Sequence, residues 1–216
     1  MAWPAMLESF FIAFAGLIDS LMVSSVGAYA VAAVGLTTQP KFLGLALFIA
    51  ANVSISALVA RRMGEGKREE ANRIFSTFFL FIIAAGIVIS ILLVAFADPI
   101  IRLCGSETET HDAAVSYFRI VMGGMIFNVI QMGVNSAQRG AGNTRITMRT
   151  NLTASVVNIG LNYLLIQGHF GFPALGVKGA ALATVIGTVV ASVMSIVSIY
   201  KDTTFISIPY LSLIHI

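Results

Sequence analysis

Charged residues are scarce in this sequence. Only 11% of its 216 residues are charged, whereas 57% are hydrophobic. Soluble domains typically contain about 25% charged and about 45–50% apolar residues. The chain therefore has too few polar side chains to cover a water-exposed surface, and we expect an integral membrane protein in contact with lipid.

Cysteine, histidine and catalytic motifs are also scarce. Cys104 is the only cysteine, so no intrachain disulfide can form, and the three histidines are scattered. There is no Walker A motif, and no nucleophile–base pair stands out, so we expect neither an enzyme nor a bound cofactor. The net charge of +3 is distributed between apolar runs, which does not indicate binding of nucleic acid.

What the sequence does contain is a series of apolar runs of about 20 residues, the length that crosses a bilayer core. We expect an all-α membrane protein, a bundle of six transmembrane helices, with Pro40 kinking the long second helix. The predicted helices cover residues 4–26, 31–60, 71–97, 113–136, 146–166 and 173–200.

The basic residues predict the orientation of these helices. Nine of the thirteen Lys and Arg lie in the connections 61–73 and 139–149 or at Lys201, whereas the loop after the third helix is acidic. By the positive-inside rule, we expect a multi-pass protein of the inner (plasma) membrane with both termini in the cytoplasm. A cleaved signal peptide is disfavoured because no Lys or Arg precedes the first apolar run and Asp19 interrupts it.

The end of the sequence continues none of these patterns. Residues 211–216, LSLIHI, resemble the translated end of an adapter used in sequencing libraries. We expect a six-helix domain over residues 1–203 and a truncated tail over residues 204–216. We also expect that residues 211–216 of that tail derive from the adapter and that the true reading frame continues.

Asp19 is an ionisable residue deep inside the first apolar run. A carboxylate there costs about 2.5 kcal/mol or more, so it must have a partner, an ion or a proton. At about 1.5 Å per residue, Asp19 lies at nearly the same depth as three other polar side chains, Asn158, Asn162 and Thr184. Their oxygens suit Na⁺, or a proton on Asp19 within a hydrogen-bond network. Interhelical hydrogen bonding is the alternative for the asparagines.

A second polar face lies on the predicted fourth helix. Asn128, Gln131 and Asn135 are spaced at three and four residues and share a side of the helix, and Met125 lies nearby. These side chains could line a substrate cavity, because methionine adapts to varied ligands. Ordinary packing between helices explains them equally well.

Several segments resemble one transporter family. "GLIDSLMVSSVGAYAVAAVGL", "ALVARRMGEGKREEANR", "SAQRGAGNTR", "NIGLNYLLI" and "FPALGVKGAALAT" resemble, in order, segments of the first six helices of multidrug and toxic compound extrusion (MATE) transporters. The resemblance covers residues 1 to 200 and implies one lobe of a twelve-helix protein. It also implies that Asp19, Asn158 and Thr184 bind the coupling ion, whereas Asn162 occupies a place where some members carry a second Asp.

The resemblance implies a secondary active antiporter. Such a protein exports amphipathic or cationic drug-like compounds in exchange for H⁺ or Na⁺, and it needs a second, C-terminal lobe as its partner. A lipid-linked oligosaccharide flippase of the same superfamily is one alternative, which a groove lined by Arg and Lys would favour. A membrane scaffold or a non-functional gene fragment is the other.

Overall fold

The computed structural model describes residues 2–200 and 205–206 of the chain, and these residues form helices and connections without any strand. The described helices are α1 (Ala2–Ser24), α2 (Ala28–Leu36), α3 (Thr38–Gly64), α4 (Arg68–Ala95), α5 (Ala97–Leu103), α6 (Thr108–Gly123), α7 (Met125–Gly140), α8 (Thr144–Leu165), the 3-10 turn η1 (His169–Gly171) and α9 (Val177–Ile199). The predicted tail, including residues 211–216, lies outside the described residues apart from residues 205–206.

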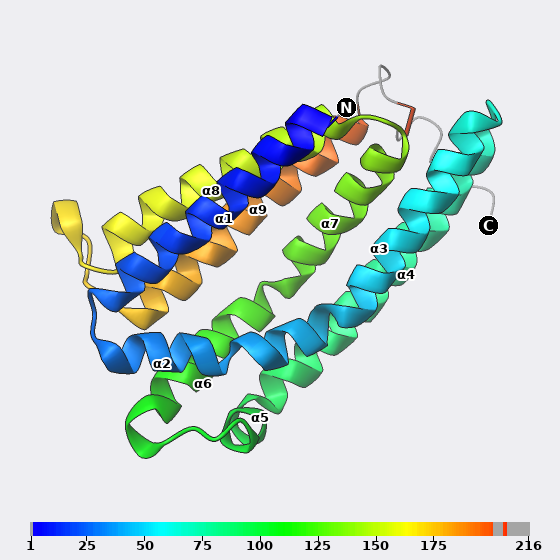
Figure 1. Cartoon of the computed structure of the whole chain (residues 1–216). Helices are drawn as coiled ribbons and strands as arrows, with labels where there is room; N and C mark the ends of the chain where they lie inside the picture. The colour runs from blue at the N-terminus through cyan, green and yellow to red at the C-terminus, as the bar shows by residue number, and fades with distance from the viewer. Residues whose placement is uncertain (1, 201–204, 207–216) are drawn as a thin grey trace.

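The long helices form two groups joined by α7. α1, α8 and α9 lie side by side, α3 and α4 pack together, and α7 contacts α3, α4 and α9 between them (Figure 1). α2 and α6 contact each other at the end opposite to the start of α1. The predicted all-α bundle is therefore confirmed.

Length and composition mark some helices as membrane spans. Among the described residues, the runs Ala28–Gly64, Arg68–Ala95 and Val177–Ile199 are long and apolar enough to cross a bilayer, and the bent pair α6–α7 adds a fourth. α1 contains a shorter apolar stretch, and α8 carries arginine, threonine and asparagine along 22 residues. The place of these two helices in the bundle follows from their packing against each other and against α9.

The second predicted helix is interrupted near its proline. α2 ends at Leu36 and α3 begins at Thr38. Proline has no N–H to donate to the carbonyl four residues earlier, and its ring crowds that carbonyl. For Pro40 this carbonyl belongs to Leu36, so the helix breaks at the residue that follows. The side chain of Thr37 donates a hydrogen bond to the Val34 carbonyl at 2.7 Å at the break.

The fourth predicted helix is bent, which the sequence analysis did not anticipate. α6 and α7 meet at Gly124 with an angle of 47°. A Cβ atom at Gly124 would come within 2.6 Å of the Val185 side chain on α9. Glycine thus allows the bend to approach α9 closely.

The sixth predicted helix begins later than expected, at Val177 instead of residue 173. The preceding segment closes the end of α8, because Leu175 N donates to the Leu165 carbonyl at 2.9 Å and Gly176 N to the Ile166 carbonyl at 3.2 Å. Gly176 adopts a φ of 54°, which glycine tolerates without strain. These bonds satisfy carbonyls that the end of α8 would otherwise leave free.

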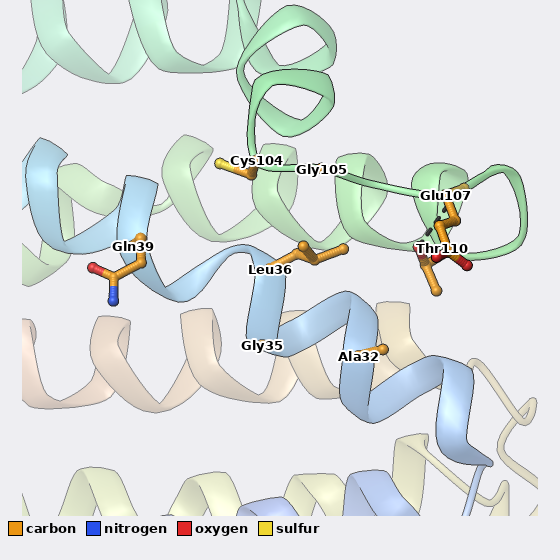
Figure 2. Close-up of a pocket in the computed structure, with 8 residues that line it drawn as sticks. All are labelled: Ala32, Gly35, Leu36, Gln39, Cys104, Gly105, Glu107 and Thr110. Atoms are coloured by element: carbon orange, nitrogen blue, oxygen red, sulfur yellow. Dashed lines mark hydrogen bonds between the residues drawn. The ribbon is translucent and has the colours of Figure 1, made fainter.

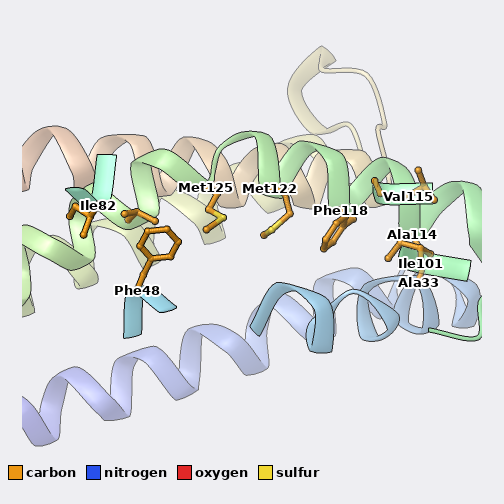
Figure 3. Close-up of a cluster of buried hydrophobic side chains, with 11 residues drawn as sticks. Ala33, Phe48, Ile82, Ile101, Ala114, Val115, Phe118, Met122 and Met125 are labelled. Atoms are coloured by element: carbon orange, nitrogen blue, oxygen red, sulfur yellow. The ribbon is translucent and has the colours of Figure 1, made fainter. Parts of the chain in front are cut away.

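Apolar packing holds the two groups together. One buried cluster joins α2, α3 and α4 to the bend between α6 and α7 (Figure 3), and its largest members include Phe48, Phe118 and Met122. A separate cluster joins α1, α2, α6, α8 and α9, and it includes Val23, Tyr117 and Ala181. This second cluster surrounds the polar residues considered next.

Candidate functional site

Asp19 lies on α1 where this helix packs against α8. Its side chain is half-buried. Asn162 of α8 is fully buried, and its Nδ2 donates a hydrogen bond to Asp19 Oδ1 at 2.5 Å. The contact is short for N–H···O and fits a bond to a charged acceptor.

The hydrogen bonds continue from Asn162 to α9. Asn162 Nδ2 also donates to Asn158 Oδ1 at 3.3 Å, and Asn158 Nδ2 donates to Thr184 Oγ1 at 3.3 Å. The two asparagines are four residues apart and share one face of α8. The structure therefore brings together all four residues that the sequence analysis assigned to one depth.

Glycine allows α9 to reach α8 at this level. A Cβ atom at Gly187 would lie 2.9 Å from the Ala154 carbonyl oxygen and 3.3 Å from Asn158 Cβ. Small residues at helix contacts allow such close approach in membrane proteins. The short separation keeps Asn158 and Thr184 within hydrogen-bond distance.

One oxygen in the group has no partner. Asn162 Oδ1 is buried and accepts no hydrogen bond from the described residues. Buried polar atoms are normally satisfied, so an unpaired acceptor beside a carboxylate calls for a cation or a proton donor. With Asp19, Asn158 and Thr184, this atom completes a set of hard oxygen ligands of the kind that Na⁺ prefers.

Comparison with known proteins identifies the family. The family model described as MatE matches residues 4–164. The chain belongs to the MatE family.

Two relatives from bacteria illustrate the match. The chain is 28% identical over 206 residues to a probable multidrug resistance protein NorM of Thermotoga maritima, covering 95% of this chain and 44% of that protein. It is 30% identical over 175 residues to a probable multidrug resistance protein YoeA of Bacillus subtilis, covering 81% of this chain and 38% of that protein. The chain thus spans less than half the length of these relatives.

Solved structures give the same result. A MATE structure in complex with MaL6 superposes with a TM-score of 0.87 at 29% identity, covering 96% of this chain and 45% of that one. A MOP superfamily transporter from Pyrococcus furiosus, described as having a binding pocket of reverse polarity that suggests a different function, superposes with a TM-score of 0.85 at 28% identity, covering 96% and 45%. The fold is therefore that of one lobe of a MATE transporter.

Two further side chains reach the Asp19 group of this MATE lobe, and the sequence analysis missed both. Tyr117 of α6 is only 3% exposed and interacts with the Thr184 side chain and with the charge of Asp19. The Nζ atom of Lys41 lies 5.0 Å from the centroid of the Tyr117 ring. Residue 41 falls inside the predicted second helix, and a lysine inside a long apolar run is itself a signal of an intramembrane site.

The amide face of the predicted fourth helix lies mostly in contacts between helices. Gln131 Nε2 donates to Asn151 Oδ1 at 2.7 Å, and Asn135 is bonded to Thr150 at 3.0 Å and to Ser195 at 3.1 Å. Met125 is 2% exposed and belongs to the apolar cluster of Figure 3. Asn128 is half-buried, and its Oδ1 has no partner among the described residues. Within this lobe, the packing alternative thus accounts for Gln131, Asn135 and Met125.

A cluster of polar side chains at the opposite end from the start of α1 was not anticipated. Ser106 Oγ lies 2.7 Å from His111 Nδ1, and His111 Nε2 lies 2.9 Å from Asp98 Oδ1. Arg102 Nε donates to Asp98 Oδ2 at 2.9 Å. These bonds lower the pKa of the Asp98 carboxyl, the His111 bond most, and they tie α5 to the beginning of α6.

A shallow pocket lies at the same end, between α2 and the connection that leads into α6 (Figure 2). It is lined by Ala32, Gly35, Leu36, Gln39, Cys104, Gly105, Glu107 and Thr110. None of the Asp19 group contributes to it, so this pocket is separate from the candidate site.

Proposed function

We propose that the chain is one lobe of a secondary active antiporter that exports amphipathic or cationic drugs and toxic compounds in exchange for H⁺ or Na⁺. The observation that carries this proposal is the half-buried carboxylate of Asp19, bonded to a fully buried Asn162 whose Oδ1 has no partner among the described residues. Ionisable groups inside membrane bundles mark ion and proton pathways. Relatives described as probable multidrug resistance proteins support the class of substrate.

The coupling step follows from the contacts of Asp19. A coupling ion acts only by binding one conformation more tightly than another. A proton or Na⁺ on Asp19 offsets the negative charge that strengthens its bond from Asn162. Because this bond joins α1 to α8, binding of the ion changes how α1 sits against the lobe and favours release of the substrate.

The substrate pathway needs more than this lobe. Alternating access is a movement of one bundle against another around a central site. We therefore propose a C-terminal lobe as the partner and a drug cavity between the two lobes. The basic connections after α3 and α7 lie at the end where α1 begins, which supports an inner-membrane protein with cytoplasmic termini (Figure 1).

The flippase alternative predicts a groove with several basic residues. In the described part of the chain, Lys41 is the basic residue that interacts electrostatically with Asp19. The connections 61–73 and 139–149 hold most of the other basic residues. This distribution supports drug export over transport of a polyanionic lipid.

The test is the variant Asp19→Asn in the protein expressed from its complete reading frame, in cells without their own efflux pumps. We expect loss of drug resistance with an unchanged amount of protein in the membrane. Asp112→Asn is the matched control, because Asp112 is an exposed carboxylate on α6. Resistance retained by Asp19→Asn would overturn the proposal and leave the scaffold or fragment alternatives.

A further inference from the structure

Lys41 occupies an unusual place for a lysine. It lies in the first turns of α3, directly after the break at Thr37 and Pro40, and its side chain is half-buried. A lysine in an apolar bundle normally extends its ammonium group to water. Here the ammonium instead lies over the ring of Tyr117, at 5.0 Å from the ring centroid.

Tyr117 connects this ammonium to the candidate site. Its ring belongs to the buried cluster between α1, α6, α8 and α9, and its hydroxyl end interacts with Thr184 and with Asp19. Thr184 is in turn bonded by Asn158, which accepts a bond from Asn162. A cation–π contact thus holds a positive charge at the edge of the Asp19 group.

The charges of Lys41 and Asp19 act on each other. The two side chains interact electrostatically, and among the described residues no carboxylate lies within the 4 Å of an ion pair with Lys41. Asp19 is therefore the acidic partner of Lys41 in this part of the lobe, without a direct ion pair between the two side chains. In this lobe the second carboxylate that some MATE members carry is Asn162, so the group holds one negative and one positive charge.

We propose that Lys41 is a tethered cation that competes with the coupling ion for Asp19. This inference rests on the proposed function of the Asp19 site. When the coupling ion is absent, the ammonium balances the charge of Asp19 and makes the empty state stable. When H⁺ or Na⁺ binds to Asp19, it is repelled by the ammonium group of Lys41. The lysine therefore lowers the affinity of the site for the ion and promotes its release.

The competition has a measurable consequence. Both H⁺ and Na⁺ add one positive charge, and a nearby fixed cation repels each of them. Removal of the lysine charge should therefore tighten the binding of a cation on the order of tenfold, which corresponds to a repulsion of about 1.4 kcal/mol. A lysine that only packs against Tyr117 would not change cation affinity in this direction.

Na⁺ is the probe, with binding of radioactive sodium measured at fixed neutral pH on protein purified from the complete reading frame. We expect Lys41→Met to bind Na⁺ on the order of tenfold more tightly than the unchanged protein. Lys41→Arg keeps the charge and should match the unchanged protein. Lys178→Met is the control, because Lys178 is an exposed lysine at the start of α9, outside the Asp19 group.

A second variant shows whether the gain acts through Asp19. Adding Asp19→Asn to Lys41→Met should abolish the tighter binding. The competition is overturned if Lys41→Met binds Na⁺ no better than the unchanged protein, or if its gain survives Asp19→Asn. The proposed function fails on a different result, namely drug resistance that persists in Asp19→Asn alone. Size-exclusion profiles confirm that each variant is folded before binding is scored.

Discussion

Asn162 of α8 donates a hydrogen bond to the carboxylate of Asp19 on α1 across 2.5 Å, and the same nitrogen bonds Asn158. The side-chain amide of Asn162 therefore joins Asp19 on α1 to the polar face of α8. Because Asn162 is fully buried, water cannot replace it if it is lost. This relationship makes Asn162 the first residue to alter.

Replacing Asn162 by leucine keeps the branched skeleton of the side chain, with two bulkier methyl groups, and removes its donors and acceptor. A hydrogen bond to a charged group contributes about 1.5–3 kcal/mol, so Asp19 should lose its position and its response to the coupling ion. We expect drug export by the complete protein to fall at least about tenfold for a loss of this size. Export of a fluorescent cationic dye from loaded cells measures the effect.

Asn143→Leu is the matched control for this experiment. Asn143 precedes α8 at the opposite end of the helix, and its side chain makes no capping hydrogen bond. Export should be unchanged in that variant. Equal export by Asn162→Leu and the unchanged protein would show that the contact between Asn162 and Asp19 has no part in transport.

Gly187 offers a test of how α9 approaches the site. An added Cβ would lie 2.9 Å from the Ala154 carbonyl oxygen, so the two helices must separate in Gly187→Ala. Overpacking of this kind costs about 1–3 kcal/mol, and separation also stretches the contact between Asn158 and Thr184. We expect a lower thermal unfolding midpoint for the purified protein.

The control for Gly187 is another glycine in the same pair of helices. Gly160 of α8 is exposed, and a Cβ there would meet no atom within 4 Å. Gly160→Ala should therefore leave the midpoint unchanged or raise it, since alanine favours helix by about 0.5–1 kcal/mol. A midpoint for Gly187→Ala at or above that of Gly160→Ala would refute the close approach of α8 and α9.

Ser90 of α4 stabilises the bend between α6 and α7. Its hydroxyl donates to the Met122 carbonyl at 2.6 Å, two residues before the break at Gly124. Ser90→Ala leaves this buried carbonyl without that donor, at a cost of about 1–3 kcal/mol. Thermal unfolding should show a destabilised protein. Ser54→Ala should show no such loss, because the exposed Ser54 bonds only the Ala50 carbonyl of its own helix.

The sequence predicted the candidate site better than it predicted the bends. The depths of Asp19, Asn158, Asn162 and Thr184 follow from the fixed rise of a helix, and the structure places these side chains in one hydrogen-bonded group. Pro40 likewise marked the interruption near Thr37, because the missing donor is a local property.

Features that depend on contacts between helices were not predictable in this way. The bend at Gly124 requires the approach of Val185 on α9, and nothing in the local sequence distinguishes this glycine from its neighbour Gly123. Lys41 lies inside the predicted second helix, but nothing in the sequence indicated a place beside Asp19. Its contact with Tyr117 depends on how α3 and α6 cross, which hydrophobic periodicity does not determine.

The last prediction concerns Asp98, which lies outside the apolar spans. Its bonds from His111 and Arg102 lower the pKa of its carboxyl below the ordinary value of 3.8. A lowered carboxyl pKa stabilises the fold at pH values above the ordinary pKa, and this contribution is lost as the pH falls through the lowered value. Asp98→Asn should therefore reduce the thermal midpoint at neutral pH, and the difference from the unchanged protein should disappear in strong acid.

Asp112→Asn is the control, because Asp112 is an exposed carboxylate on α6, and this variant should show no such difference at either pH. A deficit of Asp98→Asn that persists undiminished in acid would mean that its charge does not hold α5 to α6.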